Sequence, residues 1–117
     1  MLRPGNAGSN TAADHITVIE DALAQIPAAL IETIEIVVRT DSAGATHAVM
    51  EFCREHRLRY SAGYELTDEV RAAILKIPQD AWIAAIATDG SERENGQIAE
   101  ITDLIDLTGW PTGSRVI

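Results

Sequence analysis

The chain has 117 residues, of which 46% are hydrophobic but only 4% aromatic, so we expect one domain, or part of one, with an aliphatic core. A formal net charge of -9 opposes binding to a phosphate backbone and excludes a chain that binds nucleic acid through overall positive charge. The single cysteine excludes an internal disulfide, and no stretch approaches the roughly 20 apolar residues of a membrane span, so we expect a cytoplasmic protein without a membrane partner.

The first half of the chain predicts helices and strands in alternation. Apolar residues at helical spacing predict a helix over residues 13–26, which ends before Pro27. The β-branched run at residues 34–38 predicts a strand covered on both faces. A second helix is expected over residues 46–56 and a second strand over residues 58–62. This order favours a crossover connection, so we expect the two strands to be adjacent and parallel.

The second half of the chain predicts shorter elements. Thr67 is a candidate N-cap for a helix that ends near residue 77. Residues 82–86 and 97–102 flank the polar stretch DGSERENG, and we expect them to form a hairpin with a long loop. Turns are expected over residues 106–113, and a further strand is expected to start at residues 114–117. The apolar chain end and the opening MLRP both resemble cut strands, so we expect a piece of a longer fold.

Asp41 is the candidate site residue. It follows the first predicted strand, and the small residues Ser42, Ala43 and Gly44 come next. In open α/β sheets, ligands bind beyond the carboxyl ends of the strands, and Mg²⁺ prefers oxygen ligands. Asp41 could therefore hold a metal ion. An aspartate that caps the following turn or helix is the alternative, and one carboxylate does not decide between the two roles.

Other side chains that could bind a ligand each have an ordinary structural alternative. His47 is close to Asp41 in sequence and could face a phosphate, or it could be a solvated helix residue. The apolar side of a predicted helix carries Cys53, which we expect to be a buried small hydrophobe rather than a nucleophile. A basic cluster could contact phosphate or form a solvated helix end; it consists of Arg54, His56, Arg57 and Arg59. Two tryptophans, Trp82 and Trp110, could stack on bases or pack among the strands of the second half.

Five segments resemble, in this order, one group of bacterial insertion-sequence transposases of the DDE type: LRPGNAGSNTAADHI, VVRTDSAGATH, LRYSAGYELTDEVRAAI, DAWIAAIATDG and AEITDLIDLTGWPTGSRVI. They span nearly the whole chain, and RPGNAGSNTAADHI and LIDLTGWPTGSRVI are the most specific. The resemblance implies an α/β fold. Residues 1–64 would be a partial ribonuclease-H-like core, and residues 65–117 would be part of a small β-rich (α+β) insertion.

The resemblance also implies a site and a reaction. Enzymes of this kind carry a DDE set of carboxylates that binds two Mg²⁺ or Mn²⁺ ions. The second aspartate of the set stands in a motif of the form R-x-D-S, which matches RTDS here and makes Asp41 a catalytic residue and metal ligand. The first aspartate would lie before the RPGN segment and the glutamate beyond the insertion, so neither is expected within these 117 residues.

We therefore expect a fragment of a transposase catalytic domain that binds Mg²⁺ or Mn²⁺ weakly and does not cut DNA by itself. DNA is the partner implied by the resemblance, although this acidic chain should bind it weakly or not at all. Self-association, or pairing with an intact transposase, is a further expectation. Two alternatives stay open: a non-enzymatic modulator that pairs with an intact transposase, and a small α/β protein that binds metal or phosphate.

Overall fold

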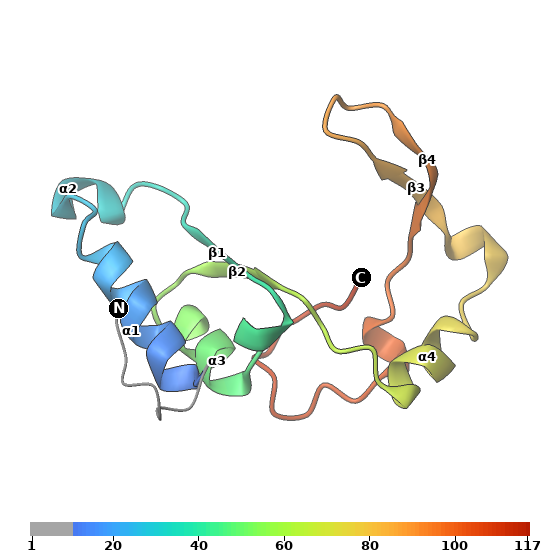
Figure 1. Ribbon diagram of the computed structural model, residues 1–117, viewed down its shortest axis with the longest axis horizontal. Coiled ribbons are helices and arrows are strands. Elements are labelled where there is room, and N and C mark those ends of the chain that lie inside the picture. The colour runs from blue at the N-terminus through green and yellow to red at the C-terminus, as the bar shows by residue number, and fades with distance from the viewer. Residues whose placement is uncertain (1–10) are drawn as a thin grey trace, which may run out of the picture. The chain divides into compact units, whose positions relative to one another are not determined.

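The computed structural model describes residues 11–117, and they divide into two compact units (Figure 1). The first unit contains the described residues up to Tyr64, together with the later segment Gly109–Pro111. The second contains Glu65–Thr108 and Thr112–Ile117. Helices and strands occur in both units, which makes the chain a mixed α/β protein. The assignment of the units to a transposase core and an insertion stays a prediction.

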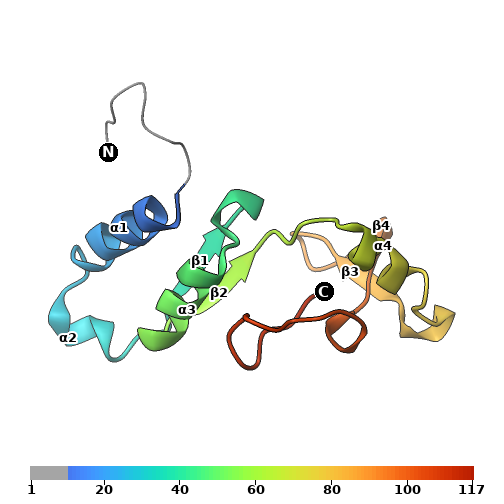
Figure 2. The ribbon, with the colours of Figure 1, turned by 90° about the horizontal axis from the view of Figure 1, so that it is seen from below.

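Two parallel strands form the centre of the first unit. β1 (Val37–Thr40) pairs with β2 (Arg59–Ala62), and the register places Val37 opposite Arg59 and Thr40 opposite Ala62. The chain passes from one strand to the other through α3 (His47–Glu55), which runs beside them (Figure 2). The predicted adjacent, parallel pairing with a helical crossover is confirmed.

Helices cover one face of this small sheet. The side chains of α1 (Ala12–Leu23) and α3 pack with alternate residues of the strands around a buried hydrophobic cluster. Val37 points the other way and is 53% exposed. The prediction of a strand covered on both faces is therefore wrong for the described residues, because the two helices lie against the same face. The cluster and its partly buried neighbours are Phe52, Cys53 and Leu58, with Ile16, Ile19, Leu23, Ile36, Val38 and Tyr60.

β1 begins later than predicted, at Val37 instead of residue 34. Its ladder starts only where a partner is present: the Arg59 N–H donates to the Ile36 carbonyl at 2.9 Å. β2 cannot reach further back, because Arg57 has a φ of 56° and turns the chain out of α3. A short helix that was not predicted, α2 (Ala28–Ile31), follows Pro27. Proline suits a helix start, since a missing N–H costs nothing there.

The second unit contains α4 (Asp68–Ile74) and an antiparallel hairpin of β3 (Ile83–Ile86) and β4 (Glu92–Ile98). Thr67 caps α4 as predicted, accepting a hydrogen bond from the Val70 N–H at 3.2 Å. The predicted hairpin is confirmed, with Ile83 opposite Ile98 and Ala84 opposite Gln97, but the long loop and the bounds 97–102 of the second strand are wrong. The Ala87 N–H donates to the Ser91 carbonyl at 2.8 Å, so the turn is short and the polar residues after it form β4.

The segment at residues 114–117 forms no strand, contrary to the prediction. One backbone bond, from the Ile101 N–H to the Val116 carbonyl at 2.9 Å, attaches it beside the core of the second unit. Turns do occupy most of residues 106–113, as predicted. The opening MLRP lies outside the described residues. Between residues 11 and 117, no helix is long and apolar enough to cross a membrane.

Candidate functional site

Asp41 directly follows the last residue of β1, and its side chain is exposed. It is also the N-cap of the short 3-10 helix η1 (Ser42–Gly44): its Oδ1 accepts a hydrogen bond from the Ala43 N–H at 3.0 Å. Within residues 11–117, the Asp41 side chain makes no other hydrogen bond or ion pair. The position expected of a ligand and the capping role expected of the alternative are thus present together, and Oδ2 is unengaged by the described residues.

The end of β2 lies against the Asp41 backbone. Gly63 follows β2, and its N–H donates to the Thr40 carbonyl at 3.3 Å. A Cβ atom at residue 63 would lie 2.9 Å from the Ser42 nitrogen and 3.3 Å from the Asp41 carbonyl carbon. The carboxyl ends of both parallel strands therefore meet beside Asp41. Figure 1 shows η1 at this end of β1.

The oxygen ligands at this edge are few. The Thr40 Oγ1 has no hydrogen-bond partner among the described residues. Because this oxygen is buried, an ion bound at the exposed Asp41 carboxylate could not reach it. Among residues 11–117, no group of three or more histidine, cysteine, aspartate or glutamate side chains could hold a metal ion. The Asp41 carboxylate fits one ligand position of a hydrated Mg²⁺ or Mn²⁺ ion, since both accept oxygen ligands and retain water.

His47 is exposed and its ring contacts an aromatic side chain; a role near a phosphate stays a prediction. Its ring lies edge-to-face with that of Trp110, with 4.4 Å between the ring centroids and 78° between the planes. Trp110 also contacts Tyr64, at a centroid distance of 5.6 Å. Gly109 has a φ of +86° and approaches the His47 ring so closely that a Cβ would lie 3.1 Å from Cε1. Trp110 therefore packs in the first unit, and the expectation that it packs among the strands of the second half is wrong.

The basic cluster is largely neutralised by neighbouring acids. Arg54 forms an ion pair with Glu51, which lowers the pKa of that carboxyl, and Arg59 pairs with Glu35 at 3.0 Å. The His56 ring stacks on Phe52 at a centroid distance of 4.0 Å. These contacts favour a solvated helix end over a phosphate-binding surface, because paired cations have less charge to offer a phosphate.

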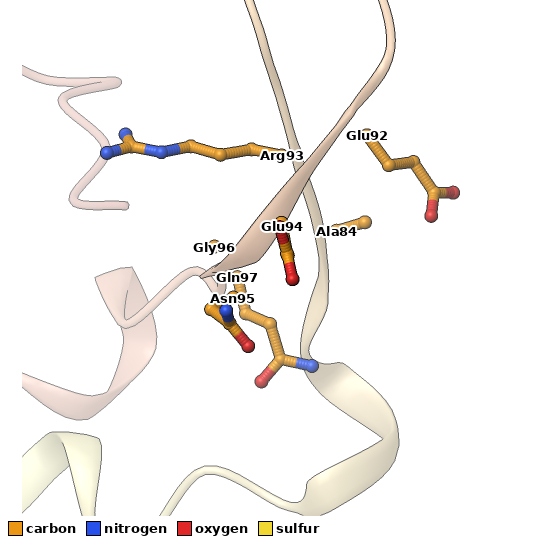
Figure 3. A pocket seen from close by; sticks show the side chains of 7 residues that line it. All are labelled: Ala84, Glu92, Arg93, Glu94, Asn95, Gly96 and Gln97. Atoms are coloured by element: carbon orange, nitrogen blue, oxygen red, sulfur yellow. The ribbon is translucent and has the colours of Figure 1, made fainter.

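An open depression beside β4 does not coincide with Asp41. Figure 3 shows Glu92 and Arg93 pointing away to different sides of the strand, so no charged groups converge there. The depression is lined by Ala84, Glu92, Arg93, Glu94, Asn95, Gly96 and Gln97. A ligand pocket normally has polar groups that converge on one position, and this surface lacks them.

A family model described as transposase DDE domain group 1 matches residues 1–117. The chain belongs to this family. Neither curated proteins nor solved structures gave a match. The recognition of a DDE transposase from the sequence is thereby confirmed, and a transposase-related function follows. DDE transposases act on DNA and generally use divalent metal ions.

In this DDE transposase domain, Cys53 takes no part in the candidate site. Its side chain is 0% exposed, and burial raises the pKa of the thiol. A buried thiol with a raised pKa is a poor nucleophile, because the thiolate is the reactive form. The small hydrophobe predicted from the sequence is confirmed by this burial.

Proposed function

We propose that this chain is part of the catalytic domain of a DDE transposase, and that Asp41 is one of the carboxylates that hold the divalent metal ions of DNA transposition. One observation carries the proposal: an exposed carboxylate directly after β1, beside the carboxyl end of its parallel neighbour β2. The same arrangement supports assigning the first unit to a ribonuclease-H-like core. The match of the whole chain to the family supports both.

The capping role of Asp41 does not compete with metal binding. Its Oδ1 accepts the Ala43 N–H at 3.0 Å, and Oδ2 remains for an ion. The Ala43 bond restricts rotation of the carboxylate, which orients Oδ2 before an ion arrives. A divalent ion held by such carboxylates stabilises the charge on a reacting phosphate and activates the attacking oxygen.

We further propose that these 117 residues do not cleave DNA by themselves. A pair of metal ions roughly 3.5–4 Å apart needs carboxylates from several elements, and Asp41 is the one that this chain contributes. The net charge of -9 also opposes a duplex, because each phosphate contact requires a cation to release counterions. The ion pairs of Arg54 and Arg59 reduce the positive charge available still further.

Metal binding can be tested on the 117-residue chain with Mn²⁺, which broadens the NMR signals of nearby amides. We expect the amides of Ser42 and Ala43 to broaden in the wild-type chain and to stay sharp in Asp41→Asn. Asp89→Asn is the matched control, since Asp89 is also exposed and its Oδ1 accepts the Ser91 N–H at 3.0 Å in the second unit. Broadening at Ser42 that survives in Asp41→Asn would refute the metal-ligand role.

Catalysis is tested by incubating supercoiled plasmid with the purified chain and Mg²⁺ or Mn²⁺. We expect no nicked or linear product. Cleavage by the wild-type chain that disappears in Asp41→Ala would show that the chain is an enzyme by itself. Cleavage that persists in Asp41→Ala would identify a contaminating nuclease and leave the expected result in place.

A second function, pairing with an intact transposase as a modulator, is supported by the exposed apolar surface beside β1. Ile34 is 46% exposed and Val37 is 53% exposed. β1 is also an edge strand of a two-stranded sheet, and an exposed apolar edge strand can pair with another chain. Adding the chain in excess to an active transposase of the same family should then lower its activity, and a Val37→Lys variant should lower it less. Equal activity with and without the chain would exclude this function.

A further inference from the structure

We infer that Gly63 is a positioning residue for Asp41: the absence of a side chain at the end of β2 determines where the Asp41–Ser42 backbone, and with it the carboxylate, can lie. The inference rests on the proposed metal-binding role of Asp41. Gly63 would act through the backbone without contacting metal or DNA.

The contact that Gly63 makes is with backbone, which cannot move aside cheaply. A Cβ at residue 63 would be 2.9 Å from the Ser42 nitrogen, 3.3 Å from the Ser42 Cα and 3.3 Å from the Asp41 carbonyl carbon. Ordinary van der Waals contact begins at about 3.4 Å, so any side chain here must push the Asp41–Ser42 backbone away from the end of β2.

Space, and not backbone conformation, is the reason for a glycine at residue 63. Its φ lies outside the left-handed region, in which Gly90, Gly109 and Gly113 are found. Alanine could therefore adopt the backbone angles of residue 63 without strain. The effect of a substitution should then appear at residues 41 and 42 and not in the course of β2 itself.

A second glycine restrains the same turn from its other side. Gly44 is buried, and a Cβ there would lie 2.6 Å from the Thr40 Cβ and 2.8 Å from both its Cγ2 and Oγ1. The Thr40 side chain is short and β-branched, so it cannot rotate away easily. The turn from Thr40 to Gly44 is therefore confined between the end of β2 and its own first residue. Side chains that bind a metal or substrate must be held within about 0.5 Å of their productive positions, and a confined turn provides such support.

The close approach can first be measured in the wild-type chain, without any substitution. We expect a nuclear Overhauser effect between a Gly63 Hα and the Ser42 amide proton. Its absence from a folded chain would overturn the inference directly, whatever the behaviour of the variants.

Gly63→Ala then tests the consequence. We expect changed chemical shifts and loss of hydrogen-exchange protection at the Ala43 amide, which donates to Asp41 Oδ1 in the wild type. With Mn²⁺ bound, broadening of the residue 63 amide should fall relative to that of Ala43, because the two strand ends have separated. Gly44→Ala should disturb the Ala43 amide in the same way. Gly96→Ala is the matched control: its Cβ would meet mainly the flexible Arg93 side chain, at 3.0 Å, in the second unit.

The outcomes separate this inference from the proposed function. An unchanged Ala43 amide and an unchanged broadening ratio in folded Gly63→Ala would overturn the positioning role and leave metal binding by Asp41 intact. Mn²⁺ broadening at Ser42 that is the same in the wild type and in Asp41→Asn would instead refute metal binding. The Ala43 amide shift and the Gly63–Ser42 proximity would still decide whether Gly63 positions the Asp41 turn.

Discussion

At the scale of single residues, Asp41 combines a cap and an unengaged carboxylate oxygen, and two substitutions separate these roles. Asp41→Asn keeps an oxygen that can accept the Ala43 N–H, so the free energy of unfolding should hardly change while Mn²⁺ broadening is lost. Asp41→Ala should lose the broadening and also about 1 kcal/mol of stability, a typical value for a lost cap. Urea unfolding of both variants gives the comparison.

The same pair of substitutions at Asp89 serves as the control. Asp89 makes an equivalent bond to the Ser91 N–H, so Asp89→Ala should destabilise the chain while broadening at Ser42 stays as in the wild type. Equal Mn²⁺ broadening at Ser42 in the wild type and both Asp41 variants would leave the cap as the only supported role of Asp41.

Cys53 gives a second prediction at this scale. Its burial raises the pKa of the thiol, and both effects slow reaction with a thiol reagent such as Ellman's reagent. The folded chain should therefore react slowly, and addition of urea through the unfolding transition should bring the rate to that of a free thiol. A fast reaction in the absence of urea would show that the core around Phe52 opens readily.

The location of Asp41 could be predicted from the sequence because it depends on neighbours in the chain: a β-branched run before it and small residues after it. The contacts of Gly63 with Ser42, and of His47 with Trp110, join residues far apart in sequence. These contacts could not be predicted from the sequence around each residue. The one local signal is Gly109, which immediately precedes Trp110 and permits a close approach to His47. Spacing along the chain contains no information on which side chains meet across a turn.

At the scale of elements, local signals succeeded where a helix has a clear start. Thr67 caps α4 as the sequence suggested, and the helix expected from residue 46 begins after Thr46, which is its N-cap. The strands were harder to predict, because a strand exists only where a partner does. β4 is polar and reads as a loop, yet pairing with β3 makes it a strand. Residues 114–117, which end in Val116 and Ile117, were predicted to start a strand, but no described strand pairs with them.

The ion pair of Glu100 with Arg115, at 2.6 Å, attaches the end of the second unit and predicts a dependence on pH. The hydrogen bonds from Arg115 and Thr102 lower the pKa of Glu100 from 4.5 to about 2. A carboxyl with a depressed pKa stabilises the fold above its ordinary pKa, and the contribution is lost as the pH falls toward 2. Between about pH 5 and pH 2, the wild type should therefore lose more stability than Glu100→Gln.

Thermal unfolding of the two proteins across this pH range makes the comparison. The side chains of Arg115 and Glu100 are 62% and 41% exposed, so added salt should shrink the difference. A difference that stays constant from neutral to acidic pH would show that Glu100 gains nothing from Arg115.

At the scale of the whole molecule, small sheets and exposed apolar side chains predict self-association. β3 is an uncharged edge strand, and Ile83 and Ile86 on it are 60% and 64% exposed. Exposed edges of this kind pair with other chains unless charge prevents it. The midpoint of thermal unfolding should therefore depend on protein concentration, and Ile83→Lys should weaken that dependence. A single sharp transition, independent of concentration and accompanied by a monomeric mass in ultracentrifugation, would contradict this prediction.

The chain returns to the first unit at Trp110, and this affects which insertions and deletions the gene can tolerate. Tyr64 and Trp110 lie in contact at 5.6 Å, so the chain between them leaves the first unit and comes back to the same place. The entropy cost of closing such an excursion grows slowly, by about 0.6 kcal/mol for each doubling of its length. In evolution, DNA between these two codons can therefore be lengthened or shortened at little cost to β1, the strand that Asp41 directly follows.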